Sequence, residues 1–477
     1  MVNIMWFRSD LRVRDNPALM AAMAAGPVVG VYFLCEQQWD SHQVSLVKRS
    51  LIIRQLNALS DSLAALHVPL VVLNAGVFQR IPGLMTDYVK RVNCHHVFCN
   101  HEYEVNEADL TCLVRQALAS AGHSLIASND QCLVEPGQIQ NRSGEPYKVF
   151  SAFRRAFYRS ADYRIRPLHF QPARQSEVAG QSGMAGQSET GSITDLSPLK
   201  RVRLCSSVDD LWPAGEDYAH ERLNRFVDEQ ATCYAEQRDI PSLDATSALS
   251  PYLATGIIST RQCLHAAVSM NQGRLTGGNK GIDAWINELL WREFYRHLLF
   301  FFPQLCKGKP FRPETDQLPW SRDEAILHRW ASGRTGYPIV DAAMRQLTET
   351  GWMHNRLRMV TAMFLTKDLF VDWRLGEQFF MSHLIDGDLA SNNGGWQWSA
   401  STGVDAVPYF RVFNPYRQSE RFDPRGEFIR KYLPELRHLD DKSIHRPSEG
   451  QANSAGYDLP IVEHGEAVKR VKACFSR

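Results

Sequence analysis

Short apolar runs alternate with helical patterns over the first 130 residues of the chain. Five of these runs are rich in β-branched and aromatic residues and predict strands, namely 2–7, 28–34, 70–74, 95–100 and 123–128. Between the second and third runs, Leu and Ile recur at helical spacing. Because strands that alternate with helices form parallel sheets, the pattern predicts a five-stranded, doubly wound α/β domain over residues 1–132.

The pattern changes after residue 132. Residues 148–166 combine six basic residues with five aromatic ones, which predicts a basic helix that packs its aromatics inward or faces phosphates. Residues 172–192 are rich in Gln, Ser and Gly and predict a flexible linker, so we assign 133–210 to a connector. From 211 to 477 the periodicity is helical and predicts a large all-α domain.

Composition narrows the class of protein. Charges nearly cancel, at a formal net charge of +1, so any nucleic-acid binding has to come from a local basic patch. The ten cysteines form no CxxC pair and no cluster with zinc spacing, which favours buried thiols in a reducing cytoplasm. The apolar run at 28–35 is too short to span a bilayer, and Arg8 and Asp10 come too early for a signal peptide. We therefore expect a cytoplasmic protein.

The segment 283–302 predicts a buried helix because it is apolar on nearly every side. At 100° per residue, one third of its circumference collects polar and aromatic side chains: Trp285, Glu288, Trp291, Arg292 and Tyr295. An ion pair between Glu288 and Arg292 is one interpretation. The other is a pocket that stacks planar rings and binds their edges. Nine of the eleven tryptophans lie beyond residue 211, which favours a planar ligand or electron transfer.

Two further segments offer candidate ligand contacts. In 243–256, Ser250 precedes Pro251 and is a candidate helix N-cap, although hydroxyls at a helix start also suit a phosphate. In 386–398 the sequence DGDLASNNGGWQW supplies Asp386 and Asp388. Arg358 is a candidate partner for one of these carboxylates, and a magnesium site is the alternative. A glycine fingerprint for a dinucleotide is missing after the first predicted strand.

Several long motifs resemble the photolyase/cryptochrome family. The runs TSALSPYLATG, WINELLWREFYRHL, GWMHNRLRMVTAMFLTKDL and LIDGDLASNNGGWQWSASTG, in this order, are similar to its FAD-binding domain, and MWFRSDLRVRDNPAL is similar to its α/β antenna domain. The similarity covers nearly the whole chain apart from the linker. It is greatest to bacterial class I cyclobutane pyrimidine dimer photolyases that use a folate antenna.

This resemblance implies a bent FAD in the helical domain. Its phosphates would be held by Tyr234, Thr246, Ser247, Leu249 and Ser250. The flavin and ribose would contact a second set, namely Trp285, Arg292, Asn355, Arg358, Asp386, Asp388 and Asn392. In this set Arg358 would pair with Asp386, and Asn392 would lie beside flavin N5, where a neutral amide favours reduced flavin.

The resemblance also implies a light-driven electron cycle. Photoexcited reduced flavin would pass an electron to a cyclobutane pyrimidine dimer, which splits and returns the electron. Trp396, Trp373 and Trp320 match the family's chain of electron donors from the flavin to the surface. The activity implied is therefore that of a deoxyribodipyrimidine photo-lyase.

Further residues correspond to the lesion pocket and the DNA surface. Glu288 would hydrogen-bond the thymine edge, and the dimer would flip out of the duplex into the pocket. Trp291, Trp398, Asn355 and Met359 would complete the pocket, and the candidates for DNA phosphates are Arg238, Arg356, Arg411 and Gln418. The related 6-4 enzymes carry two His in place of Asn355 and Met359, and DASH cryptochromes tend to carry Tyr in place of the two Trp. Both differences favour repair of cyclobutane dimers in duplex DNA.

The remaining expectations concern the antenna chromophore and the competing classes of protein. The folate site of the family corresponds to His42, Asn106, Glu107, Cys306 and Lys307, which predicts a methenyltetrahydrofolate antenna, with deazaflavin or FMN as alternatives. We expect a monomer that acts on damaged duplex DNA. A signalling cryptochrome without catalysis and a plain flavoprotein oxidoreductase are the competing classes. The missing glycine fingerprint argues against the oxidoreductase. Five residues together favour repair over signalling, namely Glu288, Trp291, Asn355, Met359 and Asn392.

Overall fold

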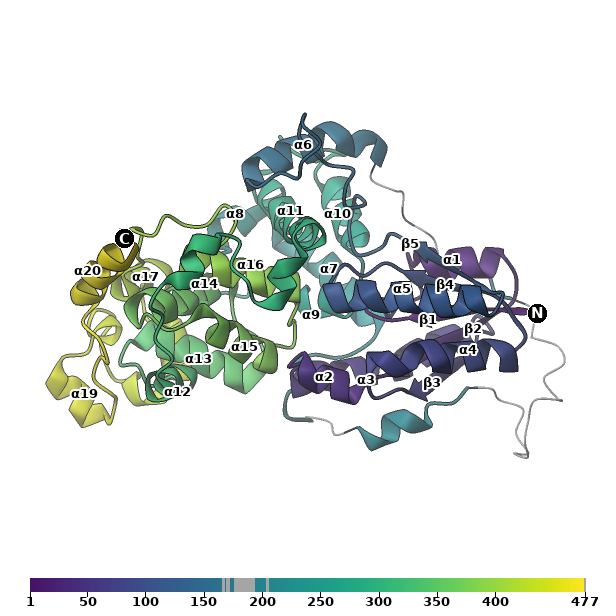
Figure 1. Cartoon of the computed structure of the whole chain (residues 1–477). Helices are drawn as coiled ribbons and strands as arrows, with labels where there is room; N and C mark the ends of the chain where they lie inside the picture. Colours follow the sequence, from purple (N-terminus) through teal and green to yellow (C-terminus); the bar gives the residue numbers. More distant parts are fainter. Residues whose placement is uncertain (165–167, 169–171, 176–193, 203–205, 476–477) are drawn as a thin grey trace. The chain divides into compact units, whose positions relative to one another are not determined.

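The computed structural model describes the whole chain except residues 165–167, 169–171, 176–193, 203–205 and 476–477 (Figure 1). Most of the predicted linker therefore lies outside the described residues. The described residues form two compact units. The first contains 1–146, 155–228 and 247–275, and the second contains 147–154, 229–246 and 276–477. These units assign 211–228 and 247–275 to the same body as the sheet, whereas the domain boundaries expected from the sequence, 132 and 211, remain predictions.

The first unit is built on the parallel sheet that the sequence predicts. Its strands are β1 (Val2–Phe7), β2 (Val28–Leu34), β3 (Leu70–Asn74), β4 (Cys94–Asn100) and β5 (Ser124–Ser128). They pair in the order β3-β2-β1-β4-β5, and every pair is parallel. The five predicted strands are confirmed to within one residue because buried parallel strands appear in the sequence as continuous apolar runs.

Helices cover both faces of this sheet, and β1 shows how the pleat divides its side chains. Met5 and Phe7 join a core with residues of α1 (Pro17–Ala24) and α3 (Leu46–Ala64), whereas Ile4 and Trp6 join a second core with α4 (Ile81–Arg91) and α5 (Val105–Ser120). The unit also contains α2 (Glu36–Ser41), α7 (Glu216–Glu229), α9 (Ser250–Ala254) and α10 (Thr260–Met270). The basic helix predicted after the sheet is α6 (Phe150–Arg164), with Phe153 and Phe157 buried.

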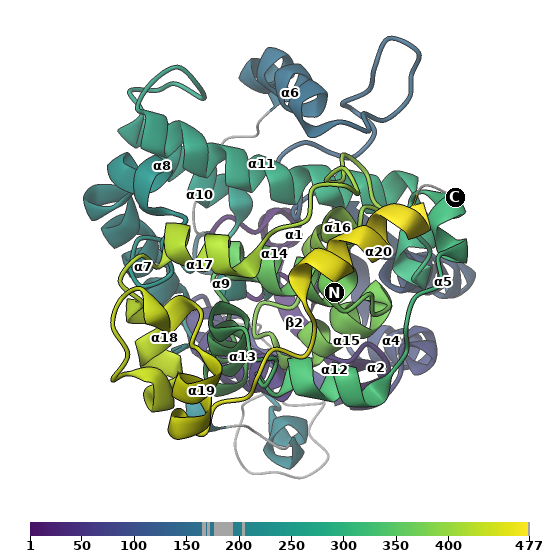
Figure 2. The same ribbon diagram turned by 90° about the vertical axis from the view of Figure 1, so that its left-hand side faces the viewer.

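The second unit is helical, as predicted, and contains no named strand among its described residues (Figure 2). Its helices are α8 (Tyr234–Gln237), α11 (Lys280–Phe301), α12 (Glu324–Ala331), α13 (Pro338–Thr350), α14 (Asn355–Met363), α15 (Trp373–His383), α16 (Leu389–Ala400), α17 (Pro415–Phe422), α18 (Glu427–Tyr432), α19 (Glu449–Ala455) and α20 (His464–Phe475). A π-helical turn, Phe364–Asp368, follows α14.

Sequence-coded caps place the helices that bear candidate site residues. Asn279 accepts backbone N–H groups at the start of α11, and Asp388 does so for α16. Helix α13 ends at Gly351, which has a φ of 68° and so suits glycine. This stop turns the chain into α14. Within the second unit, α16 packs against α11, α14 and α15, so residues distant in sequence converge around it.

Two expectations need correction. Ser250 is the first residue of α9 rather than its N-cap; Leu249 takes the cap position, with no side-chain cap hydrogen bond. The sequence analysis took the Ser250 hydroxyl as a sign of an N-cap, and so predicted that the helix starts one residue later than it does. Cys112 and Cys233 are exposed, while five other cysteines are buried as expected, and Cys205 lies outside the described residues. Among the described helices, none combines the length and the apolar character that a bilayer span requires.

Candidate functional site

A buried carboxylate with one uncommitted oxygen marks the second unit. Arg358 on α14 donates to Asp386 Oδ2 at 2.7 Å, which confirms the predicted pairing. The other oxygen, Asp386 Oδ1, is buried and has no hydrogen-bond partner among the described residues. An unmatched buried acceptor is costly, so this atom is suited to a donor group from a ligand. The N–H edge of a flavin supplies such a donor, and Asp386 therefore fits FAD.

Asp388 has a partner that the sequence did not reveal. Its carboxylate caps α16 through Ser391 N and forms an ion pair with Arg296 of α11. Arg296 lies two turns beyond Glu288 on the same helix. The sequence analysis singled out Glu288 and Arg292 there and missed Arg296. Both carboxylates of the DGD sequence thus contact an arginine. This arrangement suits a polar organic ligand better than the alternative of a magnesium ion.

Asn392, the residue expected beside flavin N5, is oriented by α15. Its amide nitrogen donates to the backbone oxygen of Glu377 at 3.0 Å. This leaves the amide oxygen as the acceptor, as a hydrogen bond from a protonated N5 would require. The Glu377 side chain accepts from Asn393 Nδ2 at 2.9 Å, and burial raises the pKa of Glu377 to about 7. The sequence analysis missed Glu377, which lies fifteen residues before Asn392.

The remaining FAD candidates are spread over both units. Trp285 is buried in α11, Arg292 is half-buried on the same helix, and Asn355 is exposed at the start of α14. Tyr234 is buried in α8, and Thr246 is half-buried. Ser247, Leu249 and Ser250 belong to the first unit, where the Ser247 backbone oxygen accepts from Arg222. Their contacts with the cofactor remain predictions.

The lesion candidate Glu288 is paired with a candidate for DNA phosphate. Arg238 Nη1 donates to Glu288 Oε1 at 2.6 Å. Burial raises the pKa of Glu288, and the Arg238 charge opposes this shift. Arg356, another phosphate candidate, donates to both oxygens of Asp239, with Nη2–Oδ2 at 2.8 Å. The sequence analysis missed Asp239, although it directly follows Arg238.

Trp291 forms part of an aromatic cluster. Phe150 lies flat against it, with ring centroids 3.7 Å apart and planes inclined by 11°, and Tyr295 lies 5.6 Å away. Phe150 was not singled out from the sequence. Of the other candidates, Met359, Trp398 and Gln418 are half-buried and Arg411 is exposed. Gln418 Oε1 is a buried acceptor without a partner among the described residues.

The three candidate electron donors lie on separate elements. Trp396 on α16 and Trp373 at the start of α15 are buried, and Trp320 before α12 is half-buried against Phe370. Each indole N–H is buried without a hydrogen-bond partner among the described residues. All three join the apolar core of the second unit. Trp320 is thus the most exposed of the three, and the order of electron transfer remains a prediction.

Three of the five antenna candidates come together in the first unit. His42 Nε2 lies 2.9 Å from Asn106 Nδ2, and His42 Nδ1 lies 3.5 Å from Glu107 Oε1. Burial, followed by the charges of Glu104 and Glu102, raises the pKa of Glu107 to about 8. Cys306 and Lys307 lie in the second unit, half-buried and exposed respectively.

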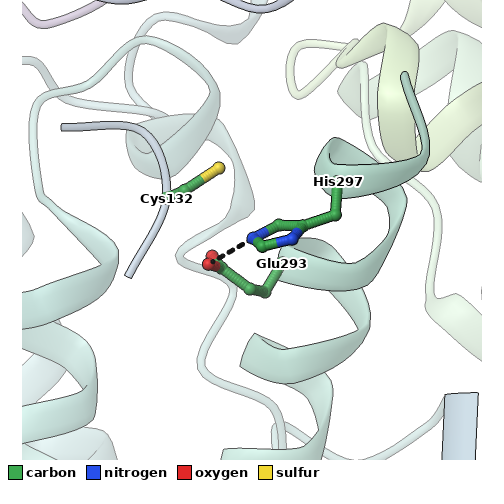
Figure 3. A group of neighbouring side chains, drawn as sticks. All are labelled: Cys132, Glu293 and His297. Atoms are coloured by element: carbon green, nitrogen blue, oxygen red, sulfur yellow. Dashed lines mark hydrogen bonds and ion pairs between the residues drawn. The ribbon is translucent and has the colours of Figure 1, made fainter. Parts of the chain in front are cut away.

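The second unit also contains a buried contact between a carboxyl group and an imidazole that the sequence analysis did not single out. Glu293 Oε1 and His297 Nε2, one turn apart on α11, lie 3.2 Å from each other (Figure 3). Both side chains are buried. Cys132, also drawn in Figure 3, belongs to the first unit.

Comparisons with known proteins give one consistent result. Residues 3–173 match the family described as DNA photolyase, and residues 285–477 match the FAD binding domain of DNA photolyase. The chain is 43% identical to the deoxyribodipyrimidine photo-lyase of Salmonella typhimurium over 98% of this chain and 96% of that protein, and 43% identical to that of Escherichia coli over 99% and 98%.

Solved structures agree with this result. A bacterial class III photolyase from Agrobacterium tumefaciens superimposes with a TM-score of 0.84 at 35% identity, covering 100% of this chain and 97% of that one. A cryptochrome from Synechocystis superimposes with a TM-score of 0.86 at 26% identity, covering 99% of both chains. On this evidence, the chain belongs to the DNA photolyase family and contains its FAD-binding domain.

Proposed function

We propose that the chain is a light-dependent DNA repair enzyme, a deoxyribodipyrimidine photo-lyase that splits cyclobutane pyrimidine dimers. The observation that supports this most directly is the 43% identity to photo-lyases over nearly the full length of both chains. When bound, reduced FAD would supply the light-driven electron that splits the dimer. The protein binds and orients the groups that react.

In this proposal, residues of the second unit hold the flavin and the ribose of FAD. The uncommitted oxygen of Asp386 would accept a hydrogen bond from the flavin edge, while Arg358 donates to the other oxygen. The Asn392 amide oxygen would accept a hydrogen bond from flavin N5–H, because its nitrogen already donates to Glu377 O. Asp388, paired with Arg296, would hold the ribose. Trp396, Trp373 and Trp320 would be the electron donors for reduction of the flavin.

The lesion pocket recognises a dimer that has left the duplex. Glu288 accepts from the thymine N–H edge, and Trp291 and Trp398 contact the dimer rings. Asn355 and Met359 complete the pocket. Flipping costs less for a damaged pair, which contributes selectivity. The DNA phosphates around the lesion contact Arg238, Arg356, Arg411 and Gln418.

The first unit binds an antenna, for which a methenyltetrahydrofolate is the best candidate. A carboxyl group with a raised pKa, such as that of Glu107, remains partly protonated near neutral pH, so it both donates to and accepts from a pterin edge. His42 and Asn106 lie beside it. We further propose that the enzyme acts as a monomer in the bacterial cytoplasm, with 1–132 as the antenna domain and 211–477 as the catalytic domain.

The test uses purified protein with reduced flavin and a duplex that contains one thymine cyclobutane dimer. Restored thymines are counted under blue light and in the dark, with a 6-4 photoproduct duplex alongside. We expect repair of the cyclobutane dimer only, and only in light. An absence of repair by a protein shown to contain reduced flavin contradicts this function and favours the signalling class of cryptochromes.

A further inference from the structure

Four charged side chains of the second unit form a chain of alternating sign. Glu288 Oε1 lies 2.6 Å from Arg238 Nη1, and Arg238 Nε lies 3.9 Å from Asp239 Oδ1. Asp239 in turn accepts two hydrogen bonds from the Arg356 guanidinium, with Nε–Oδ1 at 3.3 Å and Nη2–Oδ2 at 2.8 Å. Two acids and two bases leave this chain with no net formal charge.

Both arginines are held on a second side as well. The Arg238 guanidinium lies 5.5 Å from the ring centre of Tyr234, and that of Arg356 lies 4.5 Å from the ring centre of Phe422. Cation–π contacts of this kind help to fix the guanidinium groups in place. Neither arginine is therefore a free surface charge that awaits a phosphate.

The proposed roles of Glu288 and Arg238 compete with each other. If a DNA phosphate takes the Arg238 guanidinium away, the Glu288 carboxylate loses its partner in a half-buried position, which is unfavourable. Undamaged DNA has no extruded base that could donate to Glu288 in place of Arg238. A flipped dimer has one, because its thymine N–H would donate to Glu288.

We propose that Arg238 is a lesion-gated phosphate anchor: Glu288 retains it in the free enzyme and on undamaged DNA, and releases it to a backbone phosphate only when a flipped dimer bonds to Glu288. This inference rests on the proposed function. It makes Arg238 a specificity-determining residue, since its phosphate contact is added only in the lesion complex.

The first test measures binding in the dark, where no repair occurs. Dissociation constants of Arg238→Ala and wild type are determined over a range of salt concentrations for an undamaged duplex and a dimer-containing duplex. One phosphate contact contributes about 0.9 to the slope of log K against log salt. We expect Arg238→Ala to reduce this slope by about 0.9 for the dimer duplex and to leave it unchanged for the undamaged duplex. An equal reduction for both duplexes, or none for either, overturns the gate.

The second test releases Arg238 from Glu288 in the absence of a lesion. Glu288→Gln removes the carboxylate charge that retains Arg238, so we expect affinity for undamaged DNA to rise about fivefold and its salt slope to steepen by about 0.9. An unchanged affinity and slope for undamaged DNA contradict the proposal. Bound FAD, measured by absorbance, confirms that each variant is folded.

A matched control is available in the same unit. Arg345 and Glu435 form a similar ion pair at 2.7 Å, with side-chain exposures of 28% and 24% against 25% and 29% for Arg238 and Glu288. Glu435→Gln should leave both duplex affinities unchanged, and a rise there equal to that of Glu288→Gln would attribute the effect to net charge and overturn the gate. A wild-type protein without preference for the dimer duplex would instead contradict the proposed function.

Discussion

At the scale of single residues, Asp386 illustrates how position alone changes the role of a carboxylate. The same side chain on the surface would be hydrated on both oxygens, but here one oxygen binds Arg358 and the other is buried without a partner among the described residues. Burying an acceptor without a hydrogen bond costs free energy, and a donor from a ligand would remove this cost. The hydrogen bond from Arg358 also fixes the direction of the carboxylate.

Asp386→Asn tests this residue. Arg358 and the flavin edge both donate, but an Asn side chain has only one acceptor oxygen, so its NH2 group would face one of the two donors. We therefore expect FAD affinity to fall by about tenfold or more, corresponding to the ~1.5–3 kcal/mol of a hydrogen bond to a charged group. The ratio of flavin to protein absorbance after dialysis measures the loss. Asp458→Asn, which removes a partner of exposed Arg334, serves as control and should retain the flavin. Full flavin content in Asp386→Asn would remove Asp386 from the site.

The raised pKa of Glu377 should make the free energy of unfolding depend on pH. Its pKa is raised from 4.5 to about 7 by burial, so the folded protein holds this proton more tightly than the unfolded chain does. The stabilisation is therefore fully present below pH 4.5 and is lost as the pH rises through 7. Glu377→Gln stays neutral, so wild type should lose up to about 3 kcal/mol relative to the variant between pH 4.5 and 8. Urea unfolding at pH 5 and pH 8 measures this, and an equal difference at both values would contradict it.

At the scale of elements, the packing of α15 on α16 positions two of the three candidate electron donors. Trp373 begins α15, and Trp396 lies in the middle of α16. The contact is close because Gly376 has no side chain: a Cβ at this position would overlap the Trp396 ring and come within 2.7 Å of a methyl carbon of Leu365. A single glycine thus determines how near the two helices approach, and where the Trp396 indole lies.

Gly376→Ala should therefore displace Trp396. We expect a loss of about 1–3 kcal/mol in the free energy of unfolding, as for other overpacked cores, together with slower photoreduction of oxidised flavin. Chemical unfolding and flash photolysis measure the two effects. Gly450→Ala is the matched control, since Gly450 is a helical glycine on α19 with open space around its Cβ position. If Gly376→Ala behaves like the control, the close approach of the helices is not needed.

At the scale of the whole molecule, we expect the two compact units to differ in how much their stability depends on FAD. The first has two apolar cores, one on either face of the sheet. The second contains Asp386 Oδ1, the buried acceptor that we propose binds the flavin edge. A ligand that binds only the folded state stabilises it by mass action.

Removal of FAD should accordingly weaken the second unit selectively. At a free FAD concentration of 100 times Kd, binding contributes about 2.7 kcal/mol, which is lost in the apoprotein. Hydrogen exchange measured by mass spectrometry should show faster exchange in α14, α15 and α16, with β1, β2 and β4 unchanged. Re-addition of FAD should restore protection. Uniform loss of protection in the strands and the helices would show that stability is not divided in this way.

The sequence by itself determined the elements, the cofactor class and most candidate residues. Buried parallel strands are continuous apolar runs, so β1, β2 and β3 could be placed exactly, and long motifs identified the FAD-binding helices. Only the tertiary structure decided the partners. Asp239, Arg296 and Glu377 were missed, and Ser250 was misassigned as a cap. Ion pairs such as Glu288 with Arg238 join residues fifty positions apart, and their energies depend on distance and burial, which local patterns do not encode.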